Sequence, residues 1–98
     1  MTSADTESML ARAIKAHRSG RLKEADKIYD EILILEPSNG NANHNRGVLK
    51  VAQRNFAIAE IYFEEALKCN LIKPQYWESY IQLLIETKQL SQANKCLK

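Results

Sequence analysis

Two histidines and two cysteines are the side chains with the widest chemical range in this sequence, and their spacing offers little to a metal. Cys69 and Cys96 are 27 residues apart with no Cys-x-x-Cys pair, whereas structural zinc ligands usually come in closely spaced pairs. His17 has no second His or Cys at ligand spacing. His44 stands between two asparagines, and a lone histidine on a helix face is most often a polar surface residue. We therefore expect no metal and no other cofactor.

Recognisable catalytic motifs are absent as well. The sequence has no G-x-G-x-x-G or G-x-x-x-x-G-K-[ST] phosphate loop, no G-x-S-x-G nucleophile elbow, and no carboxylate pair in an obvious catalytic setting. We therefore expect no enzyme within these residues, so binding and structural roles come first.

Composition and charge are those of an ordinary small domain. The 98 residues form one domain at most, and a formal net charge of +2 implies no polyanionic partner. A basic cluster at Arg18, Arg21 and Lys23 has no interleaved aromatic residues, so nucleic acid is not an expected partner. No apolar run approaches the roughly 18 residues that span a bilayer, so we expect no membrane contact. Residues 1–9 do not have the pattern of a secretory signal.

The cysteine count bears on the compartment. Two cysteines are too few for a disulfide framework, so we interpret Cys69 and Cys96 as reduced, unpaired side chains on helices. Reduced cysteines are typical of a cytoplasmic protein, which is the localisation we expect.

A fixed period runs along most of the chain. Ala25, Ala59 and Ala93 are 34 residues apart, and each lies between two large apolar residues. The residues three before each alanine and four after it are Leu22 and Tyr29, Phe56 and Phe63, and Leu90 and Leu97. A period of this length indicates an array of helical hairpins.

Apolar spacing and breaking residues place two helices in each period. Asp5 or Thr6 is expected to cap the first helix, because a side-chain oxygen there accepts from the free N–H groups of the first turn. We expect helices at about 6–18, 22–35, 41–53 and 56–69, a fifth from Pro74, and a sixth from about Leu90. Short turns are expected near Ser19–Arg21, Arg54–Asn55 and Thr87–Gln89.

The sequence therefore predicts an all-α fold, an α-solenoid of three stacked helix-turn-helix hairpins of which the last is truncated. The whole of 1–98 would be one domain with repeats at about 6–39, 40–73 and 74–98. One hairpin alone has too little apolar surface to offset its ordering entropy, whereas stacked copies bury a continuous core.

This pattern resembles the tetratricopeptide repeat, a 34-residue unit that reads W-x-x-L-G-x-x-Y, then A-x-x-x-F, then P. The second helix of each unit matches well, and the first helix of copies one and two matches poorly. The matching residues are Trp77-x-x-Tyr80-Ile81-x-x-Leu84 with Ala93-x-x-x-Leu97, Asn43-x-x-Arg46-Gly47-x-x-Lys50 with Ala59-x-x-x-Phe63, and Ala25-x-x-x-Tyr29 with Pro37. The resemblance implies a protein-interaction scaffold and says almost nothing about its ligand.

A narrower resemblance concerns context. The segments GRLKEADKIYDEIL and PQYWESYIQLLIETKQLSQANKCL are similar to bacterial tetratricopeptide regions that precede glycosyltransferase, sulfotransferase or methyltransferase domains. This resemblance implies a bacterial module of a longer protein that positions a transferase domain lying outside these residues.

Two arginines depart from the family pattern, which usually has an apolar residue at their positions. Arg12 and Arg46 are one period apart. One interpretation lays their stems along apolar surface with the guanidinium groups in water. The other makes them a face that binds an anionic patch.

The resemblance implies a binding groove lined by the first helix of each hairpin. The expected groove residues are Leu10, Ile14, His17, His44, Asn45, Val48, Val51, Glu78, Gln82 and Ile85. Asn45 matches a groove asparagine in the repeats of O-linked N-acetylglucosamine transferases, but Ala11 and Ser79 at the equivalent positions do not. The carboxylate clamp of chaperone-binding repeats needs several Lys, Arg and Asn in the groove, so we do not expect it.

Two roles compete at this point. The first is a scaffold that holds a protein, a peptide or a partner helix in the groove. The second is a structural module that assembles a larger protein, in which the apolar stripe packs against an adjacent repeat or a neighbouring molecule. Self-association is also expected at the last hairpin, where an apolar patch would expose Trp77, Tyr80, Leu84 and Leu97.

Overall fold

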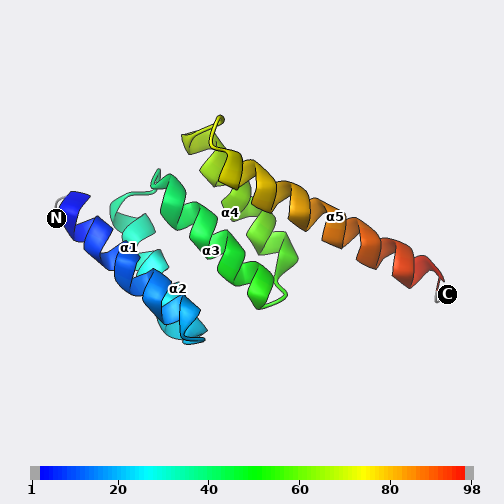
Figure 1. The fold of residues 1–98 in the computed structure, drawn as a ribbon, viewed down its shortest axis with the longest axis horizontal. Helices are drawn as coiled ribbons and strands as arrows, with labels where there is room; N and C mark the ends of the chain where they lie inside the picture. Colours follow the sequence, from blue (N-terminus) through cyan, green and yellow to red (C-terminus); the bar gives the residue numbers. More distant parts are fainter. Residues whose placement is uncertain (1–2, 97–98) are drawn as a thin grey trace.

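The computed structural model describes the backbone of residues 3–96 and the side chains of residues 5–92. Within this part of the chain every regular element is a helix, so the all-α prediction is confirmed (Figure 1). The helices are α1 (Ser3–Arg18), α2 (Leu22–Leu35), α3 (Gly40–Ala52), α4 (Phe56–Cys69) and α5 (Pro74–Cys96). The division into three repeats stays a prediction.

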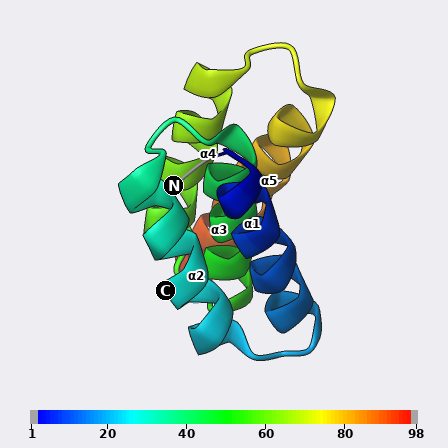
Figure 2. The same ribbon diagram turned by 90° about the vertical axis from the view of Figure 1, so that its left-hand side faces the viewer.

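Two helical hairpins make up the first two thirds of the chain, α1 with α2 and α3 with α4 (Figures 1 and 2). Their turns lie at the predicted positions. Gly20 and Arg54, one period apart, both take a positive φ, of 80° and 62° respectively. A left-handed residue is a common way to end a helix, and glycine adopts it without strain.

Small residues let the paired helices approach each other. Ala25 and Ala59 are fully buried, as the period predicts. A Cβ atom on Gly47 would lie 2.5 Å from a ring carbon of Phe63, so α3 and α4 touch here in a way that only glycine allows. Phe63 and Tyr29 fill the space beside these positions with their rings.

The joint between the two hairpins combines a set of ion pairs with an apolar core, to which α3 contributes Ala42 and Leu49. Arg46 of α3 donates to Asp26 and Asp30 of α2 at 2.8 and 3.2 Å, and Lys50 donates to Asp26 at 2.9 Å. The guanidinium also lies 5.0 Å from the ring centroid of Tyr62. Neither interpretation of Arg46 from the sequence is right, because its side chain is only 13% exposed and is already bound by two carboxylates. Arg12 is exposed and does not share this site.

Helix α1 begins earlier than the sequence predicts. It starts at Ser3, so Thr6 lies inside the helix and is not its cap. The Thr6 hydroxyl is buried and donates to Glu36 at 2.6 Å, which ties α1 to the end of α2. This long-range bond leaves no mark in the local sequence, which explains the error.

The third hairpin is the main correction. Thr87, Lys88 and Gln89 are helical, so the expected turn and sixth helix are replaced by the 23-residue helix α5. Lys88 holds the register position of Gly20 and Arg54 but stays in the helix, for which lysine has a high propensity. In Figure 1 the C-terminal turns of α5 project beyond α3 and α4. Leu97, part of the expected apolar patch, lies outside the described residues.

Candidate functional site

Two adjoining hollows follow the face where α5 meets α3. The first, the α3–α5 hollow, has a volume of about 370 Å³, and the second, the polar hollow, about 470 Å³. Both are lined by Glu78 and Ser79 of α5, so together they form one continuous groove.

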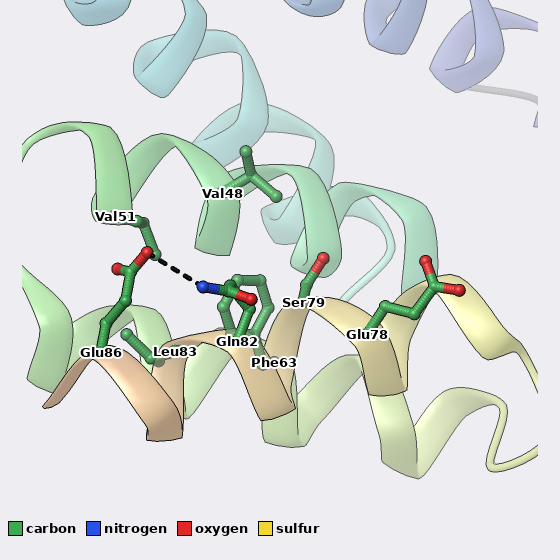
Figure 3. Close-up of a pocket in the computed structure, with 8 residues that line it drawn as sticks. All are labelled: Val48, Val51, Phe63, Glu78, Ser79, Gln82, Leu83 and Glu86. Carbon is green, nitrogen blue, oxygen red and sulfur yellow. Dashed lines mark hydrogen bonds between the residues drawn. The ribbon is translucent and has the colours of Figure 1, made fainter. Parts of the chain in front are cut away.

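The α3–α5 hollow has an apolar floor. Phe63 and Leu83, which are almost fully buried, lie beneath it, and Val48 and Val51 of α3 form one wall (Figure 3). The opposite wall is the polar side of α5, which presents Glu78, Ser79, Gln82 and Glu86. The Gln82 amide donates to the Glu86 carboxylate at 3.4 Å. The hollow is therefore apolar at its base and acidic at its rim.

The polar hollow is built around Asn41. Its side-chain oxygen accepts from Lys73 at 2.8 Å and from the Tyr76 hydroxyl at 2.7 Å. The Lys73 ammonium also lies 5.0 Å from the centroid of the Tyr76 ring. Leu10 and Ile14 of α1 line the far side of this hollow. Residues of α1, α3 and α5 thus surround it.

His44 joins the two hollows. Its Nε2 atom is 2.7 Å from the Ser79 hydroxyl, and its ring stacks on Tyr76 with the centroids 5.1 Å apart. Burial lowers the pKa of His44; a hydrogen bond to Asn45 acts in the opposite direction, and the nearby charge of Lys73 lowers the pKa further. The imidazole is therefore neutral at pH 7, and it bonds Ser79 as a neutral donor or acceptor. These contacts with Ser79 and Tyr76 hold the His44 ring against α5.

The architecture can now be compared with solved structures. In sequence, no family model and no characterised protein matches the chain. In structure, it superposes on the Yersinia enterocolitica type III secretion chaperone SycD, in complex with a peptide of the translocator YopD, with a TM-score of 0.82. The identity is 16%, over 96% of this chain and 72% of that one. The first TPR of Spaghetti (RPAP3), bound to an HSP90 peptide, gives a TM-score of 0.84 and 20% identity over 97% and 77% of the two chains.

The chain has a tetratricopeptide-repeat fold. A further TPR protein, YrrB, described as having an unusual peptide-binding site, gives a TM-score of 0.77 and 22% identity. That match covers 87% of this chain and 44% of YrrB. At these identities the likeness establishes the TPR fold alone.

Most of the predicted groove residues come together in this fold. The two hollows are lined by eight of them: Leu10, Ile14, His44, Asn45, Val48, Val51, Glu78 and Gln82. His17 and Ile85 line neither hollow. Ile85 is 46% exposed on α5. His17 is partly buried on α1, and this burial lowers the pKa of its imidazole. That these eight residues bind a ligand stays a prediction.

Sequence reasoning missed several lining residues. Lys73 and Asn41 lie at helix starts, outside the stripe defined by the period. By sequence, Phe63 was identified only as a large apolar residue of the repeat. In the structure its ring also lines the α3–α5 hollow. Glu86 could have been found, because it follows Gln82 by one helical turn on the same face.

The described residues also bear on metal binding and on membrane insertion. No cluster of three or more His, Cys, Asp or Glu side chains in this part could hold a metal ion. None of the helices there has an apolar stretch of the length that crosses a bilayer. Cys69 is a free, exposed thiol. The side chain of Cys96 is not among those that the structure describes.

Proposed function

We propose that this chain is a protein-interaction module that holds a linear peptide or a partner helix in the groove formed by the two hollows. The observation that carries this proposal is the α3–α5 hollow, which has an apolar floor, an apolar wall on α3 and a polar wall on α5. Ligand sites typically combine an apolar base with a few polar groups that orient the ligand.

The solvent-accessible apolar side chains of the groove, Leu10, Ile14, Val48 and Val51, would supply most of the affinity, because Phe63 and Leu83 are already almost fully buried. An apolar side chain of the partner would rest on Phe63 and Leu83 and contact Val48 and Val51, while the amide of Asn45 can donate and accept at once. The groove is short, so we expect affinities on the order of micromolar or weaker. The peptides bound to SycD and to the Spaghetti TPR support this use of the fold.

The test is a selection from a random peptide display library on the immobilised chain, followed by fluorescence polarisation with the selected peptides. Val48, which is 36% exposed, lines the groove, so Val48→Glu places a charge there without entering the core. We expect at least tenfold weaker binding by this variant. Ile34→Glu is the matched control, because Ile34 is 72% exposed on α2 and lines neither hollow. Equal binding by the parent and Val48→Glu, with both folded, would overturn the proposal.

A structural role is the second candidate, and the exposed stripe on α5 favours it. Trp77, Ile81 and Leu84 are 40%, 50% and 41% exposed. The equivalent residues of α1, two periods earlier, are Met9, Ala13 and Ala16, which α2 helps to bury. An apolar stripe with no cover from its own chain is suited to self-association.

We therefore propose that two copies associate through α5 at high concentration, with the stripes of two antiparallel helices in contact. Sedimentation at protein concentrations up to about 1 mM should show a concentration-dependent dimer, weak because the stripe is far smaller than a standard interface. Ile81→Glu should keep the chain monomeric, and Ile34→Glu should not. A parent chain that stays monomeric throughout would rule this role out.

We also propose that this chain has no catalytic activity of its own. Its setting would be the cytoplasm of a bacterium, and it would lie ahead of a transferase domain.

A further inference from the structure

The rim of the α3–α5 hollow carries charge of one sign only. Its lining includes two carboxylates, Glu78 and Glu86, and no lysine or arginine. Within the described chain neither carboxylate forms an ion pair, and Glu86 accepts a hydrogen bond from the neutral amide of Gln82. A partner that enters this hollow therefore meets two carboxylates available for pairing.

Two cations line the neighbouring hollows, and each of those hollows also includes one of the two carboxylates. Lys73 belongs to the polar hollow, where Asn41 accepts from its ammonium. Arg54 borders a separate shallow hollow that it shares with Glu86, and its guanidinium lies 5.0 Å from the ring centroid of Phe56. Neither one lines the α3–α5 hollow.

The spacing of the two carboxylates sets the length of the matching segment. Glu78 and Glu86 are eight residues apart on α5, which corresponds to about 12 Å along the helix axis. An extended peptide covers about the same distance in four residues. The apolar floor of Phe63 and Leu83 lies between the two acidic positions (Figure 3).

We propose that the groove selects segments with two basic residues four positions apart and a large apolar residue midway between them. This inference rests on the proposed peptide-binding function and adds the chemistry of its partner. The basic side chains would pair with Glu78 and Glu86, and the apolar one would contact the floor. The preference is opposite in charge to the acidic SRMEEVD peptide bound by the Spaghetti TPR.

Three synthetic peptides that differ only in the flanking charge test the preference: GRSLSRG, GQSLSQG and GESLSEG. Fluorescence polarisation at low salt should show GRSLSRG binding about tenfold tighter than GQSLSQG, since two exposed ion pairs are lost, and GESLSEG binding weakest. Added salt should narrow the difference because it screens exposed charges.

The decisive variant is the double substitution Glu78→Gln and Glu86→Gln. It should bind the Arg and Gln peptides equally and should leave the affinity for GQSLSQG unchanged. The matched control, Glu7→Gln with Glu31→Gln, removes the same charge from exposed positions on α1 and α2 and should keep the tenfold preference. A control that loses the preference as fully as the groove variant would overturn the inference, because the effect would then come from net charge.

The two levels of the proposal fail in different ways. Equal affinity of the parent for all three peptides, weakened by Val48→Glu, would refute the charge preference and leave the groove function standing. Tight binding of the neutral GQSLSQG peptide that Val48→Glu does not alter would refute both, since the new carboxylate cannot form an ion pair with this peptide. Absence of binding below about millimolar for every peptide would refute the basic–apolar–basic partner.

Discussion

The α3–α4 hairpin and helix α5 start from the same repeat pattern and end in different structures. In the hairpin, Arg54 turns the chain with a φ of 62°, and Gly47 brings α4 against α3. In α5 the equivalent residues are Lys88 and Ile81, the helix continues, and Ile81 stays half exposed. The difference shows that the repeat period alone does not make a hairpin. The chain must also turn, and the two helices must have small residues where they come into close contact.

The close contact should give the largest effect. Gly47→Ile puts into α3 the residue that α5 carries at this position, and its Cβ alone would overlap the Phe63 ring. We expect a loss of about 3 kcal/mol in the free energy of unfolding, measured by urea denaturation. Ile81→Ala is the comparison and should cost well under about 1 kcal/mol, because Ile81 is half exposed. Similar losses for the two variants would mean that α3 and α5 are packed alike.

The ion pairs between the two hairpins should give an intermediate effect, and no ion pair among the described residues joins α5 to another helix. Burial alone would raise the pKa of Asp26, but hydrogen bonds from Lys50 and Arg46 outweigh it and hold the pKa below its usual value. A carboxyl whose pKa is lowered on folding stabilises the protein above its unfolded pKa of about 3.9, and the contribution disappears as the pH falls through the folded pKa.

Asp26→Asn should therefore cost about 2 kcal/mol at pH 7 and much less at pH 2, where the parent has lost the same contribution. Urea denaturation at the two pH values measures both numbers. Asp30→Asn is the control, since the side chain of Asp30 is 55% exposed and should contribute less than about 1 kcal/mol. A cost for Asp26→Asn that is unchanged at pH 2 would show that charge is not the source of the stability.

The turn residues should give the smallest effects, with opposite signs at two equivalent positions. Arg54→Gly removes the cost of a left-handed non-glycine residue and should stabilise the chain by up to about 1 kcal/mol, less the contact of Arg54 with Phe56. Lys88→Gly places glycine inside a helix and should destabilise α5 by up to about 1 kcal/mol. Circular dichroism during thermal unfolding measures both shifts. Stabilisation by both substitutions would indicate that α5 turns at Lys88 in solution.

The sequence predicted the first two hairpins well because their signals are local. Ala25 and Ala59 are small residues one period apart at the contact between paired helices, Gly20 lies at a turn and Gly47 at a close helix contact, and each has the structural role that its size suggests. The continuous α5 was missed because the same period was extended to residues that carry no helix-breaking Gly or Pro.

The groove was predictable in outline only. The period places Val48, Glu78 and Gln82 on one face, and the structure brings them together. The bonds of His44 to Ser79 and of Asn41 to Lys73 join residues more than 30 positions apart, so local spacing could not reveal them.

Trp77 gives the chain a built-in optical probe. It is the only tryptophan, and its indole N–H donates to the Leu71 carbonyl at 2.6 Å while its ring stays 40% exposed. Trp77 lies on the α5 stripe and lines neither hollow. Its emission maximum should therefore move to shorter wavelength when a second molecule covers that stripe. The maximum should stay unchanged when a peptide enters the groove. One fluorophore thus separates the two events without any label.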